Sequence, residues 1–276
     1  AAGGTGSATA PVPTTATGGN TVYYVSQTIS ACEGPRASIT VTVNNLPAAP
    51  STTSTITYCQ NTTATALTAT GSSLLWYTSA TGGTGSATAP TPSTATPGNY
   101  NFYVSQTVNN CEGPRSQITV TILPVTPAPT VSSPVTYCQN STASPLTATG
   151  TGLLWYTTAT GGTGSATAPT PSTSTAGSTT YYVSQTTTPC GESVRTPLVV
   201  NITALPAAPV TSPLTICQAS TAAPLTASGS NLLWYTSATG GTGVSSLAPS
   251  TTNVGNTTYY VSQTVSSCEG PRAPLV

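Results

Sequence analysis

A long internal repeat constrains the fold of this chain most strongly. The stretch "LLWYTTATGGTGSATAPTPSTSTAGSTTYYVSQT" at residues 153–186 recurs with small changes at 74–107 and 232–264, and the chain opens partway through it with "AAGGTGSATAP". Corresponding cysteines lie 79 or 78 residues apart. Units that cannot fold alone repeat every ~20 to 50 residues, whereas about 79 residues approaches the size of a small independent domain. The repeat therefore predicts tandem domains.

The period sets the expected domain boundaries. Residues 1–46 are the C-terminal half of a truncated domain, which we call the half repeat; repeat 1 follows at 47–125, repeat 2 at 126–204 and the nearly complete repeat 3 at 205–276. The connecting sequences "NNLPAAP", "LPVTPAPT" and "TALPAAP" are rich in proline, and such connectors are extended and stiff. We therefore expect the domains to be arranged end to end, in a chain that is an internal piece of a longer protein.

The pattern within each repeat is that of β-strands. In repeat 2, short segments rich in Val, Thr and Tyr alternate with Gly and Pro, and no segment has the apolar spacing of an amphipathic helix. This predicts an all-β fold in which each repeat is an antiparallel β-sandwich of about seven short strands. Alternation along the strands places Leu146, Tyr181 and Val183 in a core with a tryptophan. The core tryptophans of the three repeats are Trp76, Trp155 and Trp234.

The same alternation turns other apolar side chains away from the core. Leu154, Tyr156 and Tyr182 of repeat 2 have the opposite parity to Trp155 and Val183. A regular series of outward apolar groups predicts a contact surface for copies of the chain or neighbouring repeats. The alternative is a set of scattered surface aromatics, which are common. The candidates for the assembly surface are Leu75, Tyr77, Tyr103, Leu154, Tyr156, Tyr182, Leu233, Tyr235 and Tyr260.

The cysteines predict disulfides and therefore secretion. Each complete repeat has one cysteine at the end of its first strand and one in the turn between its last two strands, and the half repeat has only the second. Disulfides persist in secreted proteins, and the absence of histidine and of CxxC spacing argues against a metal site. The seven candidates are Cys32, Cys59, Cys111, Cys138, Cys190, Cys217 and Cys268.

Two disulfide connectivities remain open at this point. Pairing within repeats joins Cys59 to Cys111, Cys138 to Cys190 and Cys217 to Cys268. Pairing between neighbouring repeats joins Cys59 to Cys190 and Cys138 to Cys268, and leaves Cys32, Cys111 and Cys217 for other repeats. Disulfides more often close within one domain, which favours the first connectivity. The inward set Leu146, Trp155, Tyr181 and Val183 resembles the core of an immunoglobulin domain. That topology favours the second connectivity, because it separates the two turns of one domain by a strand of roughly 26 Å, whereas bonded cysteines have Cα atoms within about 7 Å.

Charge and side-chain chemistry argue against most other functions. The chain has four arginines and four glutamates, with zero net charge and no lysine, aspartate, histidine or methionine. Each glutamate lies in the same turn of its repeat, "CEGPR" or "CGESVR", which is typical of a scaffold and not of an active site. We therefore expect no enzymatic activity and no cofactor. Nucleic acid is not an expected partner without a basic surface, and no apolar run reaches the ~18 to 20 residues of a membrane span.

The recurring motifs "YCQNSTASPLTATG", "LLWYT", "GGTG", "YYVSQT", "CEGPR" and "ITVTV" together resemble the tandem Ig-like repeats of giant surface and secreted proteins of Bacteroidota. This resemblance covers essentially the whole chain. It implies an extracellular or cell-surface location and export by the type IX secretion system. It also implies a role in an adhesin, a gliding-motility filament or an extracellular fibre.

Two functions follow as expectations. The first is structural: the chain is a segment of an extracellular filament or stalk, because evenly repeated domains supply length and repeated contacts but no single pocket. The alternative is an adhesin that binds surface glycans, because exposed tyrosine rings stack on sugar faces while Thr, Asn and Gln supply neutral hydrogen bonds.

Overall fold

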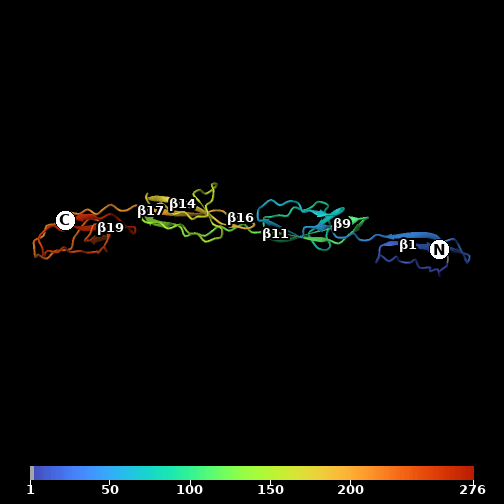
Figure 1. The fold of residues 1–276 in the computed structure, drawn as a ribbon. Coiled ribbons are helices and arrows are strands. Elements are labelled where there is room, and N and C mark those ends of the chain that lie inside the picture. Colours follow the sequence, from blue (N-terminus) through green and yellow to red (C-terminus); the bar gives the residue numbers. More distant parts are fainter. Residues whose placement is uncertain (1–2) are drawn as a thin grey trace. The chain divides into compact units, whose positions relative to one another are not determined.

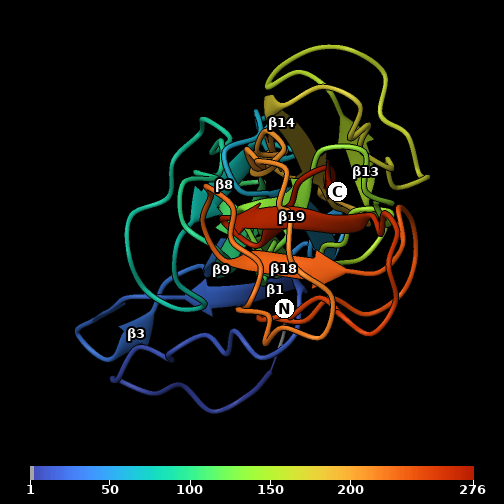
Figure 2. The same ribbon diagram turned by 90° about the vertical axis from the view of Figure 1, so that its left-hand side faces the viewer.

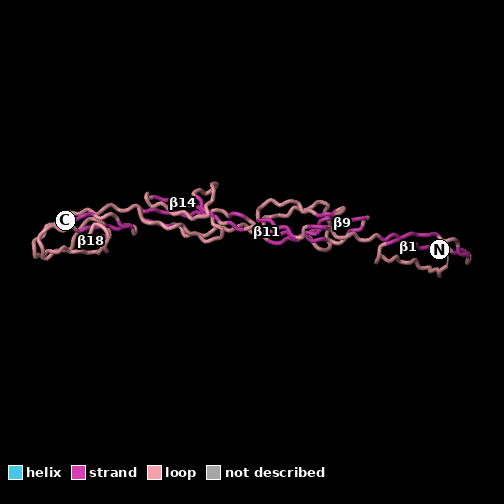
Figure 3. The backbone as a smooth tube through the Cα atoms, in the orientation of Figure 1, coloured by secondary structure: helices cyan, strands magenta, loops and turns pink. Residues whose placement is uncertain are grey.

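The computed structural model describes residues 3–276. Its regular secondary structure is entirely β-strand over that range, as Figure 3 shows, and this confirms the all-β prediction. Two compact units divide the chain, the first ending at Val125 and the second beginning at Thr126. Figure 1 draws the strands as arrows, coloured along the sequence, and labels some of them.

The half repeat forms a two-stranded ribbon. β1 (Gly19–Val25) pairs antiparallel with β4 (Ala37–Val43), and β2 (Thr28–Ile29) pairs with β3 (Cys32–Glu33). Val25 and Ile39 are 54% and 55% exposed, although their counterparts in repeat 1, Val104 and Ile118, are fully buried. Residues 3–46 thus contain the strands of a core but not the strands that would cover it.

Repeat 1 contains a five-stranded sheet. Its strand order is β10-β9-β11-β6, with β8 paired to β9. β6 pairs parallel with β11, whereas β9 pairs antiparallel with β8, β10 and β11. The parallel pair departs from the purely antiparallel expectation because the first strand changes sheets: β5 pairs with β7, and the chain then crosses to lie beside β11. The bounds are β5 Ser51–Thr52, β6 Thr55–Cys59, β7 Ala69–Thr70, β8 Leu74–Tyr77, β9 Gly98–Val108, β10 Cys111–Glu112 and β11 Ser116–Leu123.

Repeat 2 follows the same plan, whereas repeat 3 keeps the strands around its tryptophan but has no first strand and no parallel pair over the described residues 205–276. In repeat 2 the order is β12-β17-β14-β13, again with a parallel β12–β17 pair, and β15 pairs with β16. In repeat 3, β19 pairs with β18, β20 and β21, and Figure 2 shows β18 beside β19. The bounds are β12 Val135–Cys138, β13 Leu154–Tyr156, β14 Gly177–Ser184, β15 Thr186–Thr187, β16 Gly191–Glu192, β17 Thr196–Thr203, β18 Leu232–Tyr235, β19 Tyr259–Val265, β20 Cys268–Glu269 and β21 Ala273–Leu275.

One tryptophan lies at the centre of each core. In repeat 2, Trp155 packs with Leu146, Val183 and Leu198, and Tyr181 is partly buried against them. Repeats 1 and 3 bury Trp76 and Trp234 in the same way. The backbone of each tryptophan also pairs with the segment after the "GGTG" loop, so that this loop returns to the edge of the sheet.

Candidate functional site

The structure buries three of the residues predicted for the assembly surface. Tyr77 and Tyr156 are 7% exposed and Tyr235 is 5% exposed, so the prediction that these tyrosines form an outer contact surface is wrong. The reason is that the loop after β8, β13 or β18 folds back over the face of the sheet opposite the tryptophan. The other six candidates are half-buried: Leu75, Tyr103, Leu154, Tyr182, Leu233 and Tyr260.

Each buried tyrosine belongs to a polar cluster. In repeat 2 the hydroxyl of Tyr156 donates to Oε1 of Glu192 at 2.6 Å, and the hydroxyl of Ser184 donates to the same oxygen at 2.6 Å. The guanidinium carbon of Arg195 lies 3.2 Å from the centroid of the Tyr156 ring. Arg195 Nη1 also donates to the carbonyls of Thr158 and Gly161 in the covering loop, both at 2.8 Å. We call these four side chains the tyrosine cluster.

The tyrosine cluster recurs in all three repeats. The distances in repeats 1 and 3 agree with those in repeat 2 to within 0.1 Å for the two hydroxyl bonds and for the ring contact. The members are Tyr77, Ser105, Glu112 and Arg115 in repeat 1, and Tyr235, Ser262, Glu269 and Arg272 in repeat 3.

The last glycine of "GGTG" makes room for the tyrosine. A Cβ added to Gly164 would lie 2.5 Å from Oη and 2.7 Å from Cζ of Tyr156, closer than real Cβ contacts allow. Gly85 and Gly243 lie equally close to the tyrosines of their own repeats. None of the three has a positive φ, so glycine is required here for space and not for backbone conformation.

The cluster keeps its glutamate ionised. Hydrogen bonds from Ser184 and then Tyr156 lower the pKa of Glu192, with the charge of Arg195 adding to the effect and partial burial opposing it. The pKa values of Glu112 and Glu269 are lowered by the same causes in the same order. The half repeat lacks the tyrosine; there Ser26 and Arg36 lower the pKa of Glu33. A carboxylate held by two hydroxyl donors connects strands and has no proton to transfer at neutral pH.

A glutamine ties the start of each repeat to its sheet. In repeat 2 the side chain of Gln185 donates to the carbonyl of Pro127 at 2.8 Å, and its Oε1 accepts from the backbone N–H of Thr151 at 2.8 Å. Gln106 and Gln263 make the equivalent bonds in repeats 1 and 3. Sequence reasoning missed this contact, although the recurrence of glutamine in "VSQT" was its visible signal.

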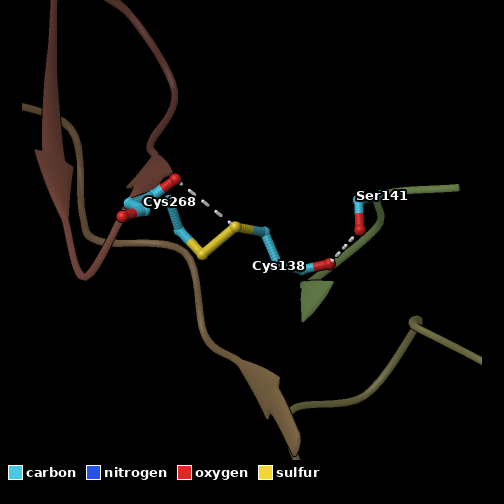
Figure 4. The surroundings of a disulfide bond; sticks show 4 residues. Cys138, Ser141 and Cys268 are labelled. Carbon is cyan, nitrogen blue, oxygen red and sulfur yellow. Dashed lines mark hydrogen bonds between the residues drawn. A yellow bond between two sulfur atoms is a disulfide. The ribbon is translucent and has the colours of Figure 1, made fainter. Parts of the chain in front are cut away.

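A disulfide joins repeat 2 to repeat 3. Cys138 at the end of β12 is bonded to Cys268 at the start of β20, with Cα atoms 5.5 Å apart, as Figure 4 shows. Cys138 Sγ lies 3.7 Å from the carbonyl oxygen of Ser267. Cys59 and Cys190 are also disulfide-bonded, and the pairing of these two with each other stays a prediction. The free cysteines are Cys32, Cys111 and Cys217.

The pairing within repeats is therefore wrong. The observed bond rules out Cys138–Cys190 and Cys217–Cys268, and the free thiol of Cys111 rules out Cys59–Cys111. The register gives the reason, because Cys138 lies opposite Thr203 at one end of β17, whereas the turn with Cys190 precedes the other end. At about 3.3 Å per residue, eight residues separate the two positions by roughly 26 Å.

Residues 3–276 contain neither a metal cluster nor a membrane-spanning helix. No group of three or more His, Cys, Asp or Glu side chains suited to a metal ion occurs in this range. Nor does this range contain a helix with the length and apolar character needed to cross a bilayer.

Comparison with known proteins identifies the repeated unit. A family model described as "Ig-like domain CHU_C associated" matches residues 47–124, 127–203 and 206–276. No curated protein matches the chain.

Solved structures of tandem domains resemble the chain more distantly. Human CDH23 EC21-23 is 12% identical with a TM-score of 0.31, covering 83% of this chain and 99% of that one. Sidekick-1 immunoglobulin domains 1-4 are 10% identical with a TM-score of 0.25, covering 94% of each. Titin domains I67-I69 are 10% identical with a TM-score of 0.28, covering 70% and 77%. All three TM-scores lie below 0.5.

Proposed function

Because this chain belongs to the CHU_C-associated family of Ig-like domains, which its three repeats match in tandem, we propose that it is a structural segment of an extracellular filament or stalk. The observation that carries the proposal is the Cys138–Cys268 bond, which crosses the boundary between two repeats. Membership of a giant surface protein of Bacteroidota, exported by type IX secretion, is the finer form of the same proposal.

A bond across a repeat boundary suits a mechanical role. Cys138 and Cys268 are separated by 130 residues in sequence, and closing a loop of that size costs the unfolded chain about 5 kcal/mol in the chain-entropy model. The same bond limits the angles that two neighbouring domains can adopt. Disulfides persist in oxidising compartments, which supports an extracellular location.

The distribution of charged side chains supports a role without chemistry. Each complete repeat has one glutamate and one arginine, and the tyrosine cluster uses both to fasten a loop to the sheet. A catalytic site would require proton donors or nucleophiles with tuned pKa values. The lowered pKa of Glu192 instead keeps its carboxylate charged at neutral pH, where it serves as a hydrogen-bond acceptor.

Assembly with copies of the chain or with neighbouring repeats is part of this proposal. The half-buried tyrosines Tyr103, Tyr182 and Tyr260 lie directly opposite the buried tyrosines on the adjacent strand, so they remain on the face proposed for contacts. Binding of surface glycans is the alternative. It has less support, because the three tyrosines covered by arginine cannot stack on a sugar.

Electron microscopy of the secreted protein tests the proposal. We expect filaments with a regular axial repeat, and we expect Tyr103→Ser, Tyr182→Ser and Tyr260→Ser together to disperse them while circular dichroism still shows folded β-structure. The matched control is Tyr100→Ser, which changes an exposed tyrosine outside the set. Intact filaments in the triple variant would reject these residues as contacts. Dispersed particles in the unmodified protein that bind a glycan array would favour the adhesin.

A further inference from the structure

We infer that the free cysteines are complementary half-sites of one disulfide that joins Ig-like repeats, and that the partner of Cys217 is the hairpin cysteine of a further repeat. Cys138 ends β12, and Cys217 has the corresponding position in repeat 3, although the structure has no strand over 211–217 where the sequence predicted one. We call these two the strand-end cysteines, and we call Cys32, Cys111 and Cys268 the hairpin cysteines. The inference rests on the proposed scaffold role, which it deepens by naming the partner that each free thiol accepts. Its basis is the bonded pair Cys138–Cys268, in which one cysteine of each type takes part.

The turn at Cys217 is already shaped like the turn at the bonded Cys138. In both turns, the serine three residues after the cysteine donates to the cysteine carbonyl at 2.7 Å. The glutamine directly after the cysteine donates from its side chain to a backbone carbonyl, that of Ser174 in repeat 2 and that of Thr252 in repeat 3. The residue two positions after the cysteine has a φ of 63° at Asn140 and 61° at Ala219. The matching bonds are Ser141–Cys138, Thr173–Ser141 and Gln139–Ser174, against Ser220–Cys217, Thr251–Ser220 and Gln218–Thr252. This geometry therefore does not depend on the disulfide.

The hairpins at Cys32 and Cys111 likewise match the bonded hairpin at Cys268. In each, the cysteine pairs with the residue three positions earlier, across a turn whose two central residues have positive φ. The central residues are Ser30 (48°) and Ala31 (59°), Asn109 (52°) and Asn110 (61°), and Ser266 (48°) and Ser267 (63°). All three hairpins thus hold the cysteine in one orientation.

Exposure shows that the free positions are accessible to a partner. The bonded Cys268 is 1% exposed, whereas Cys32 and Cys217 are exposed and Cys111 is half-buried. The bonded pair also fixes the direction, since the strand-end cysteine belongs to one repeat and the hairpin cysteine to the next along the chain. A second copy of this chain carries both types of free thiol and is a sufficient partner for a test.

The bond forms by thiol–disulfide exchange. A thiolate attacks a disulfide oxidant, such as oxidised glutathione, and releases one glutathione; the second cysteine then displaces the other glutathione from the mixed disulfide. Two thiols lose two protons and two electrons in all, and one oxidised glutathione becomes two reduced molecules. Docking of the two preformed turns stabilises the product between opposite types only.

Two variants of the full chain separate the types. The first, Cys32→Ser with Cys111→Ser, leaves the strand-end thiol Cys217 free; the second, Cys217→Ser, leaves the hairpin thiols free. They are mixed at equal concentration in a glutathione redox buffer, and crosslinked dimers are quantified by non-reducing electrophoresis and peptide mass spectrometry. The baseline for random pairing is the triple serine variant carrying Val12→Cys, a thiol placed at a 91% exposed position, mixed with the hairpin variant.

We expect Cys217 to form heterodimers with Cys32 or Cys111 at an equilibrium yield about tenfold above this baseline, which corresponds to ~1.4 kcal/mol of docking. Homodimers through Cys217 should stay at the baseline. Heterodimers at or below the baseline, or an equal yield of Cys217–Cys217 homodimers, would overturn the inference. That result would leave the scaffold proposal standing, because filament formation is measured separately by microscopy.

Discussion

The substitution Gly164→Ala tests why each "GGTG" loop ends in glycine. The added Cβ would lie 2.5 Å from Oη and 2.7 Å from Cζ of Tyr156, and 3.0 Å from Cβ of Leu154. Overpacking of this kind costs ~1 to 3 kcal/mol when the surroundings shift. If the ring leaves its place instead, the charged hydrogen bond to Glu192 is lost at ~1.5 to 3 kcal/mol, together with the Arg195 contact. We therefore expect a loss of about 3 kcal/mol from the stability of repeat 2.

Hydrogen–deuterium exchange with mass spectrometry measures this loss locally. Peptides from β13 and β14 should exchange by global opening of repeat 2 about a hundredfold faster in Gly164→Ala, since ~1.4 kcal/mol is a factor of ten. Peptides from repeat 1 provide an internal control, because its own Gly85 is unchanged.

A double-mutant cycle then identifies the clashing partner. In a Tyr156→Ala background the space in front of Gly164 is empty, so the further change to alanine should cost less than about 1 kcal/mol. If Gly164→Ala is equally costly with and without the tyrosine ring, the glycine serves some other purpose and the steric reasoning is refuted.

Three further changes test the polar contacts of repeat 2. Ser184 and Tyr156 hold the pKa of Glu192 below 4.5, so the carboxylate contributes fully to stability above that pH and the contribution is lost as the pH falls through the lower folded-state pKa. Glu192→Gln should therefore reduce the dependence of the unfolding free energy on acid pH, measured by urea unfolding. An unchanged pH dependence in this variant would count against the prediction. Tyr156→Phe should cost ~1.5 to 3 kcal/mol at pH 7 by the same assay, and clearly less once the pH has fallen below the lowered pKa of Glu192, because the acceptor is then protonated. Gln185→Ala should cost ~1 to 3 kcal/mol and speed hydrogen exchange at the Thr151 amide, because it removes the acceptor of that amide. Unchanged protection of the Thr151 amide from exchange would contradict this role of Gln185.

Alternation along the strands was sufficient to predict the cores but not the outer face. Trp155 and Val183 are buried where a period of two places them, because core packing fixes the inner face of a strand. The burial of Tyr156 depended on a loop that folds back over the sheet. Its signals lay in two separate segments of the repeat: the last glycine of "GGTG", and the glutamate and arginine of the turn "CEGPR" or "CGESVR". No local pattern reveals that such segments meet in space.

The disulfide connectivity was open in the sequence for a similar reason. Spacing alone is compatible with pairing inside a repeat, and only the distance between the two turns separates the alternatives. The parallel β12–β17 pair supplies that distance, because it carries Cys138 to the far end of β17 from the hairpin. The parallel pairing itself was not predicted, since a strand that changes sheets has the same period of two before and after the crossing.

Tryptic mapping without reduction tests the bond between repeats most directly. The four arginines are the only basic residues, so trypsin applied to the unfolded, thiol-blocked chain yields the fragments 116–195 and 196–272, each containing two cysteines. The account predicts that these fragments stay joined through Cys138 and Cys268 until a reductant is added. Recovery of the two fragments as separate peptides, each closed by its own internal disulfide, would contradict it.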